Sequence, residues 1–313
     1  MRLRGDKEKA KNSPMIARKY LYLIALAKEK HFGRAAAACH VSTSTLSAAI
    51  RDLEAELGVA VVERGQHFTG LTPEGQRVLD YAQRVAAQAE ALRQDLANLQ
   101  GGLTGQLRIG VIPTALTRVA ELTASFARRH PQTTILVRSM TTAAILQDLR
   151  SFELDAGIVY SESGEDTDLA FQPMWVEGHV LLTGADYFPD RISVGWAEAA
   201  TLPLCLLTPD MQNRKIIDKV FAELGRPVLP KLETNSLLGM LGQICAGPWS
   251  GIVPRAVFDL IGAPAGIRAL DLENPTVAWA TGLITLAREP QAPMVTALRE
   301  EARDLRALSG KDE

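Results

Sequence analysis

The chain is poor in cysteine and in aromatic residues, and it lacks a long apolar run. Only three of its 313 residues are cysteines, and aromatic residues make up 5%. Cys39, Cys205 and Cys245 are too widely spaced for a metal site or a disulfide framework, so we expect structural thiols. No apolar stretch approaches the ~20 residues that span a bilayer. The run at 20–27 leads straight into charged residues, which favours a buried helix over a signal peptide and predicts a cytoplasmic protein.

Motifs for catalysis and for metal binding are also missing. The five histidines have no metal-ligand spacing: His31, His40, His67, His130 and His179. The segment 247–251 places its serine at the wrong position for Gly-x-Ser-x-Gly, and no glycine-rich phosphate loop is present. The sequence therefore predicts no catalytic residue, no metal site and no cofactor.

Charge is distributed unevenly along the chain. Residues 1–69 carry 12 Lys or Arg against 7 Asp or Glu, a net charge of +5. The totals of 34 and 36 leave 22 against 29 for the remainder, a net charge of −7. A basic head on an acidic body attracts phosphates without making the whole protein bind polyanions.

Residues 33–58 predict a helix, a tight turn and a second helix. Ser42 is suited to cap the second helix, and Gly58 to end it. Steps of four, three and four residues place Leu46, Ile50, Leu53 and Leu57 on one buried face. The other face keeps short hydroxyl side chains and Arg51, which suit phosphates and base edges in a DNA major groove. On pattern alone, an ordinary pair of packed helices remains an open alternative.

Two further elements follow this helix pair. Residues 60–71 predict two short strands around a glycine-containing loop, which would form the wing of a winged helix-turn-helix. Thr72-Pro73-Glu74 predicts the start of a long helix. Apolar residues recur along it at alternating steps of four and three: Val78, Ala82, Val85, Ala89, Leu92, Leu96 and Leu99. This heptad pattern favours pairing with a second chain over packing on the same domain.

Beyond a hinge at 100–105 the pattern changes to strands that alternate with helices. Buried strands are predicted at 107–112, 133–139 and 156–160, with helices at 115–129 and 143–152 between them. This succession is typical of a parallel sheet flanked by helices, and a second unit of the same kind follows. Pro113-Thr114-Ala115 places a hydroxyl and free N–H groups at a helix N-terminus, which is a physical anion site.

The order of these parts resembles that of the LysR-type bacterial transcriptional regulators. The residues similar to the family signature are His31–Ala36, Val41–Ser42, Leu46–Ser47, Ile50, Leu53–Glu54, Leu57–Gly58, Arg64, Leu71–Thr72 and Gly75. Residues 105–110 and 154–159 resemble strands of the family's effector domain. The implied fold is multidomain: an N-terminal all-α winged helix-turn-helix, a long dimerisation helix, and a C-terminal α/β effector domain of two lobes like periplasmic binding proteins.

The expected boundaries follow from this resemblance and from the pattern. They are a disordered arm at 1–14, with Met15 as an alternative start, a DNA-binding domain at 15–72, a dimerisation helix at 73–99, a hinge at 100–105 and an effector domain at 106–309. Lobe I would comprise about 106–178 and 277–309, and lobe II about 179–276.

The resemblance also implies function, partners and site residues. It implies an effector-responsive regulator that binds double-stranded promoter DNA as a homodimer or homotetramer, with RNA polymerase as a further partner and no membrane. The DNA-binding candidates are Arg34, Ser42, Thr43, Ser44, Thr45, Ser47, Arg51, Arg64 and His67. Many family members have Gln-Pro at the positions of Thr43-Ser44, and a basic residue at Ala48. The target sequence is therefore less predictable than the fold.

A small effector, expected to be a carboxylate, would lie in the cleft between the lobes. Its candidate contacts are Thr114, Ala115, Thr141, Thr142, Thr208, Asn235, Ser236 and Gly247. The threonines could instead serve only as helix caps. The alternative for the whole chain is a cytoplasmic solute-binding or enzymatic α/β protein with an accessory DNA-binding domain.

Overall fold

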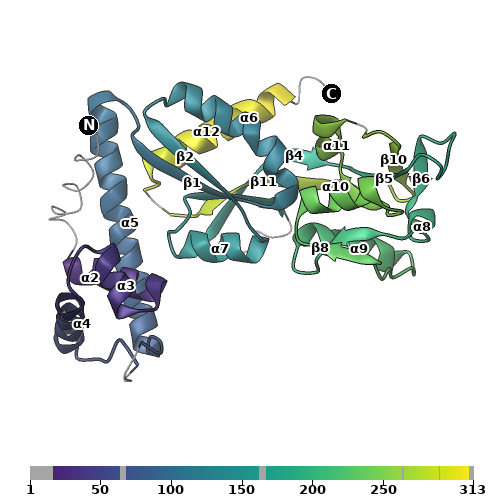
Figure 1. Cartoon of the computed structure of the whole chain (residues 1–313). Helices are drawn as coiled ribbons and strands as arrows, with labels where there is room; N and C mark the ends of the chain where they lie inside the picture. Colours follow the sequence, from purple (N-terminus) through teal and green to yellow (C-terminus); the bar gives the residue numbers. More distant parts are fainter. Residues whose placement is uncertain (1–16, 64–67, 162–166, 263, 289, 310–313) are drawn as a thin grey trace, which may run out of the picture. The chain divides into compact units, whose positions relative to one another are not determined.

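The computed structural model describes residues 17–63, 68–161, 167–262, 264–288 and 290–309. The chain divides into two units, residues 1–101 and 102–313, and each unit is described by itself (Figure 1). No helix within the described ranges is long and apolar enough to cross a membrane.

Helices dominate the first unit. They are α2 (Arg18–Glu29), α3 (Phe32–Ala38), α4 (Thr43–Leu57) and α5 (Pro73–Gly101). Leu46, Ile50 and Leu53 of α4 are buried with residues of α2 and α3, as the periodicity predicts. The prediction that Leu57 is buried is wrong, because its side chain is 41% exposed. Leu57 is the last residue of α4, and Gly58 turns the chain away there with a φ of 68°.

Side chains cap α4 and attach the start of the wing to this helix. Ser42 Oγ accepts a hydrogen bond from the N–H of Thr45 (3.1 Å), which caps α4. Glu54 Oε1, also on α4, accepts hydrogen bonds from the N–H groups of Val61 (2.7 Å) and Val62 (3.0 Å). Val62 then forms an antiparallel bridge with Leu71. The start of the wing is therefore tied directly to α4.

Gly75, in the first turn of α5, lies against the same segment. A Cβ atom at this position would be 2.0 Å from the carbonyl oxygen of Val61. Only glycine therefore lets α5 begin so close to the wing.

Lobe I of the second unit is built on a five-stranded sheet of order β2-β1-β3-β11-β4. The strands are β1 (Gly105–Val111), β2 (Thr133–Ser139), β3 (Ala156–Tyr160), β4 (Leu169–Glu177) and β11 (Trp279–Leu286). Around them lie the 3₁₀ turn η1 (Pro113–Ala115), α6 (Leu116–Arg129), α7 (Thr142–Arg150) and α12 (Pro293–Ser309). Figure 1 shows α6 and α12 on one face of the sheet and α7 on the other.

The prediction of a parallel sheet holds for only part of lobe I. β1 pairs in parallel with β2 and β3, whereas β11 is antiparallel to β3 and β4. The chain leaves lobe I along β4 and returns along β11, so these two connecting strands run in opposite directions.

Lobe II contains a four-stranded sheet of order β6-β10-β5-β9 and a parallel pair, β7-β8. The strands are β5 (His179–Gly184), β6 (Ser193–Gly195), β7 (Cys205–Leu207), β8 (Leu232–Thr234), β9 (Gly251–Pro254) and β10 (Ile267–Glu273). The helices are α8 (Trp196–Ala199), α9 (Gln212–Glu223), α10 (Leu237–Ala246) and α11 (Arg255–Ile261). This second sheet is also mixed, because β10 is parallel to β6, whereas β5 is antiparallel to β9 and β10.

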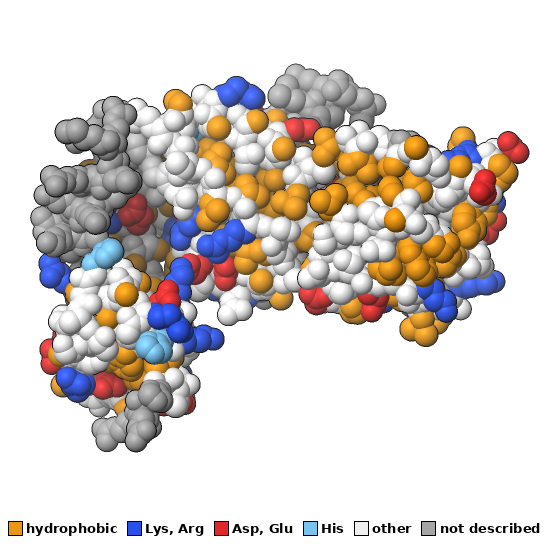
Figure 2. All heavy atoms as spheres, in the orientation of Figure 1, with side chains coloured by type: hydrophobic (Ala, Val, Ile, Leu, Met, Phe, Trp, Pro, Cys, Tyr) orange, Lys and Arg blue, Asp and Glu red, His pale blue; other side chains and the backbone are white. Residues whose placement is uncertain are grey.

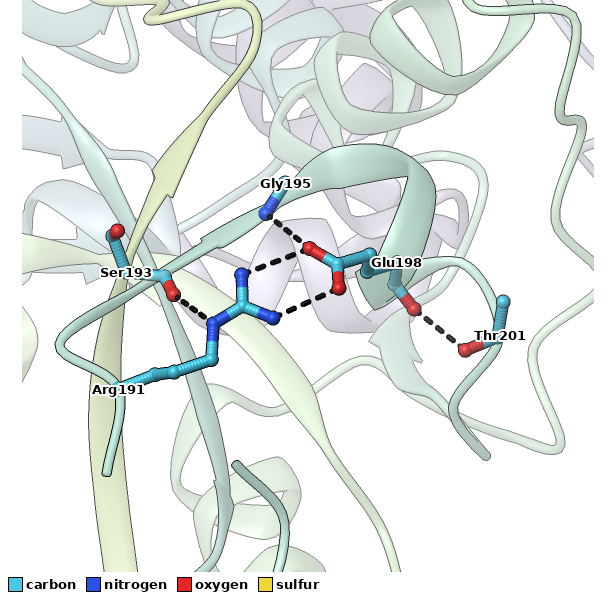
Figure 3. A network of polar contacts seen from close by, with 5 residues as sticks. All are labelled: Arg191, Ser193, Gly195, Glu198 and Thr201. Atoms are coloured by element: carbon cyan, nitrogen blue, oxygen red, sulfur yellow. Dashed lines mark hydrogen bonds and ion pairs between the residues drawn. The ribbon is translucent and has the colours of Figure 1, made fainter. Parts of the chain in front are cut away.

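In lobe II, a network of hydrogen bonds surrounds the start of α8 (Figure 3). The guanidinium of Arg191 donates to both carboxylate oxygens of Glu198 (2.8 and 2.9 Å) and to the carbonyl oxygen of Ser193 (3.1 Å). The Glu198 carboxylate also accepts from the N–H of Gly195 (3.3 Å). Pairing with Arg191 lowers the pKa of Glu198.

Candidate DNA-binding face and ligand site

The first turn of α4 carries a cluster of exposed hydroxyl groups. Ser42 Oγ lies 2.8 Å from both Ser44 Oγ and Thr45 Oγ1, and Thr43 is exposed beside them. The N–H groups of a helix N-terminus attract anions, and these hydroxyls extend that polar surface. The face therefore suits phosphate and base-edge contacts.

Two arginines flank this face and differ in their surroundings. Arg51 is exposed on α4 and forms no ion pair with another described residue. Arg34 donates to the carbonyl oxygen of Glu29 (2.6 Å) and lies 3.6 Å from its carboxylate. Arg51 is therefore the more available cation, while Ser47 is half-buried. Arg64 and His67 lie outside the described residues.

The predicted dimerisation seam of α5 is mixed in exposure. Val85, Leu92 and Leu96 expose 38%, 45% and 53% of their surface. Val78 packs against the core of the first unit, and Ala82 and Ala89 are buried. The Leu99 side chain lies outside the described residues. The later part of α5 thus presents large apolar side chains at heptad spacing.

In lobe I, three candidate ligand residues follow the carboxyl ends of parallel strands. β1 and β2 are in register up to Val111 and Ser139, so Thr114 and the segment 141–142 meet at one sheet edge. Thr141 Oγ1 accepts from the N–H of Ala144 (3.3 Å) and caps α7. The buried Thr142 Oγ1 has no hydrogen-bond partner among the described residues. Thr141 is thus a cap, whereas the Thr142 hydroxyl is free.

Lobe II has a matching edge where β7 and β8 end. The N–H of Thr208 donates to the carbonyl oxygen of Thr234 (3.0 Å), and the buried Thr208 Oγ1 has no partner among the described residues. Asn235 and Ser236 are exposed beside this edge, and Ser236 Oγ caps α10 by accepting from the N–H of Gly239 (3.1 Å).

The two remaining candidates, Ala115 and Gly247, have N–H groups that are already hydrogen-bonded within the chain. Ala115 is fully buried, and its N–H donates to the carbonyl oxygen of Ile112 (3.0 Å). The N–H of Gly247, just after α10, donates to the carbonyl oxygen of Gln243 (3.0 Å). Contact of these two residues with a ligand stays a prediction.

A buried polar chain that the sequence did not predict connects the two lobes. Tyr160 OH, at the end of β3, lies 3.1 Å from Thr114 Oγ1 and 3.5 Å from Glu177 Oε2. Asn213 Nδ2, on α9, donates to Tyr160 OH (3.5 Å) and to His179 Nε2 (2.8 Å). Each of these residues is buried. Asn213 thus joins a lobe I tyrosine to the first strand of lobe II.

Burial controls the protonation of this chain. It raises the pKa of Glu177 to about 7, partly offset by the nearby Arg118 cation, and raises that of Tyr160. It lowers the pKa of His179 to about 3, so this imidazole is neutral near pH 7. In the amide orientation in which Asn213 donates to Nε2, the His179 ring proton lies on Nδ1. That buried nitrogen has no partner among the described residues.

The buried chain and the strand ends beside it offer hydroxyl, amide and imidazole groups, which can form hydrogen bonds. Among the residues that the structure describes, no three His, Cys, Asp or Glu side chains gather as metal ligands would.

Comparisons with known proteins match both units. The model described as "Bacterial regulatory helix-turn-helix protein, lysR family" matches residues 17–76, and the model described as "LysR substrate binding domain" matches residues 100–307. The chain belongs to the LysR family of bacterial transcriptional regulators. It is a DNA-binding transcriptional regulator and not an enzyme, so the alternative of an enzymatic protein falls away.

Individual proteins similar to this chain include a peroxide-inducible gene activator and OxyR proteins. The chain is 37% identical over 158 residues to a "Probable hydrogen peroxide-inducible genes activator" of Mycobacterium xenopi, covering 50% of this chain and 83% of the relative. It is 27% identical over 289 residues to the "DNA-binding transcriptional dual regulator OxyR" of Escherichia coli, covering 91% and 93%. The solved structure of a full-length OxyR variant from Pseudomonas aeruginosa has a TM-score of 0.75 and 27% identity, covering 93% of this chain and 96% of that one.

Proposed function

We propose that this regulator responds to a small molecule, a carboxylate, which binds reversibly between the two lobes of its second unit. The observation that carries the proposal is the pair of buried, unpartnered hydroxyls of Thr142 and Thr208. They follow strand ends in different lobes, and the hydrogen bonds of Asn213 join those lobes beside them. A buried hydroxyl without a partner is costly, and a bound ligand would satisfy both groups.

The helix ends around this site support an anionic ligand. Neither α6 nor α9 has a side-chain cap at its N-terminus, so their first N–H groups are unsatisfied by side chains. Free N–H groups at a helix N-terminus, together with the helix dipole, favour a carboxylate. Thr114 and Thr141 lie in the same part of lobe I but already have hydrogen bonds, so we assign them supporting roles.

Peroxide sensing is the second candidate, because the relatives are named as peroxide-inducible activators. A thiol reacts with peroxide as the thiolate. Burial raises the pKa of Cys39 and raises that of Cys205 to about 11, which disfavours their thiolates. Cys245 is the exposed thiol. Burial thus disfavours direct oxidation of Cys39 and Cys205, and Cys245 is the thiol on which a response to peroxide would depend.

On DNA, we propose a dimer paired through Val85, Leu92 and Leu96 of α5, with α4 of each chain in a major groove. Two recognition helices on one dimer would then meet two half-sites. Figure 2 shows hydrophobic side chains gathered over lobe II. Leu229, Leu238 and Leu260 of this lobe are largely exposed. This apolar surface supports further contacts between dimers, as a homotetramer requires. RNA polymerase would be the partner at the promoter.

A thermal-shift screen of mono-, di- and aromatic carboxylates tests the ligand site. At least one carboxylate should raise the melting temperature of the wild-type chain. Thr142→Val and Thr208→Val should each reduce this shift, because valine has the same shape without the hydroxyl. Neither variant should lower the melting temperature without ligand, since the lost hydroxyl had no partner.

Thr285→Val is the matched control. Its hydroxyl is also buried and unpartnered, but it lies on β11 opposite Ala170. Thr285 is four residues further along β11 than Thr281, the residue that pairs with Tyr160. The ligand-induced shift should be unchanged in this variant. Equal shifts in wild type and in all three variants would overturn the site.

A further inference from the structure

We infer that α9 is a clasp that fastens the two lobes together, with Asn213 as its polar contact and Ile216 as its apolar contact. Both residues lie in the first half of this lobe II helix, and both reach lobe I. The clasp itself does not depend on a ligand. Only its expected effect on ligand binding rests on the proposed function.

One end of the clasp is firmly fixed in lobe II. The buried guanidinium of Arg214 donates to the carbonyl oxygen of Leu207 (2.8 Å) and to the carboxylate of Glu233 (2.5 Å). It also donates to Asp218, one turn further along α9 (2.8 Å). These bonds hold α9 to both β7 and β8. Ile217, Val220 and Phe221 of the same helix complete its attachment by packing in the lobe II core.

Ile216 behaves differently from the isoleucine that follows it. Ile216 is 2% exposed and belongs to the buried cluster of lobe I, together with residues of β1, β3 and α6. Ile217 is 1% exposed and belongs to the lobe II cluster. Adjacent residues of a helix point about 100° apart, so one helix can serve two cores. Moving the lobes apart would therefore expose Ile216 but would leave Ile217 buried.

Asn213 lies one turn before Ile216, at i and i+3, so the two side chains are neighbours on the helix surface. Its amide bonds Tyr160 in lobe I and His179 in lobe II. The polar and apolar contacts thus act at one place. Because α9 follows shortly after Thr208, a ligand held by that hydroxyl would sit at the base of the clasp and could bias its closure.

Hydrogen exchange of the full-length protein, measured by mass spectrometry without ligand, tests the clasp. We compare Ile216→Ala with Ile217→Ala, which remove the same atoms from equally buried sites. Ile216→Ala should speed exchange at 111–115 and 156–160 of lobe I by about tenfold or more, because opening becomes easier. Ile217→Ala should speed exchange within lobe II and leave these lobe I segments unchanged.

Two further variants guard against simple unfolding. Ile216→Val is a milder change and should show the same pattern with a smaller increase, and Asn213→Leu should also speed exchange at 156–160. Equal exchange at the lobe I segments in Ile216→Ala and Ile217→Ala would overturn the clasp. So would an unchanged rate in Ile216→Ala. Since no ligand is added, this failure is distinct from a failure of the carboxylate screen.

Discussion

Two buried titratable residues at the junction of the lobes depend on pH in opposite directions. Burial raises the pKa of Glu177 in the folded chain to about 7. This group therefore contributes its full stabilisation of the fold below about pH 4.5, and that stabilisation is lost as the pH rises through 7. His179 has a lowered pKa, about 3, so it favours folding above about 6.5 and opposes it as pH falls towards 3. Between about pH 4.5 and 6.5 the two effects oppose each other.

The variant Glu177→Gln isolates the carboxyl group. It should gain stability relative to wild type as pH rises from about 4.5 to 7, and this difference should be constant above that range. The full change is of order ~3 kcal/mol, at ~1.4 kcal/mol for each pKa unit. Thermal unfolding of both proteins at pH 5 and pH 8 measures it. A stability difference that is the same at both pH values would contradict the burial-driven shift.

Arg51 is the residue on which we expect DNA affinity to depend most. Arg51→Ala should weaken binding to operator DNA and reduce the salt slope of the binding constant by about 1, because one phosphate contact is lost. Mobility-shift titrations at several salt concentrations measure both quantities. Arg303→Ala, which removes an exposed charge from the second unit, is the control. Unchanged affinity and slope for Arg51→Ala would show that the placement of α4 is wrong.

Residue-level prediction from sequence succeeded where the cause is local. Ser42 was predicted as a cap from its position before an amphipathic run, and it caps α4. Tyr160, His179 and Asn213 were missed as site residues, because Asn213 is 53 residues from Tyr160 and 34 from His179, and only the folded lobes bring them together. Nothing in their immediate neighbourhoods signals a shared hydrogen-bond chain.

At the scale of elements, strongly periodic segments were predicted well. The strands at 133–139 and 156–160 match β2 and β3, and the cap at Thr72 starts α5. The prediction missed β4, β6, β8, β10, α8 and α10. In β4 a proline, Pro173, interrupts the strand pattern, and in α10 Gly239 and Gly242 lower helix propensity. Packing of Met240 and Ile244 in the lobe II core makes α10 a helix nonetheless.

Pairing of α5 gives a prediction at this scale. Leu92→Glu places a charge in the proposed seam between two chains, so it should shift the protein towards the monomer. Sedimentation of the full chain measures this shift, and Gln83→Glu, at a position of α5 that does not flank the seam, serves as control. A dimer of unchanged stability in Leu92→Glu would place the interface elsewhere.

At the scale of the whole molecule, the helix-turn-helix part and the two lobes belong to separate units. The basic segment up to Thr69 belongs to the unit that carries α4, and the acidic remainder carries the two lobes. Charge distribution, the heptad pattern and the family resemblance predicted a basic DNA-binding part followed by an acidic remainder. The identity of the signal was not predictable in the same way, because in our proposal it depends on the hydroxyls of Thr142 and Thr208, and only the folded structure shows that they lack a partner among the described residues.

The most direct test of the central claim is a mobility-shift experiment with DNA from upstream of the protein's own gene. The wild-type chain and the double variant Thr142→Val/Thr208→Val are compared with each carboxylate of the panel and with hydrogen peroxide. We predict that both proteins bind the DNA, and that a carboxylate changes the affinity of the wild type but not of the double variant. We also predict that peroxide changes neither. A response to peroxide without a response to any carboxylate would contradict the account, as would failure of the wild type to bind.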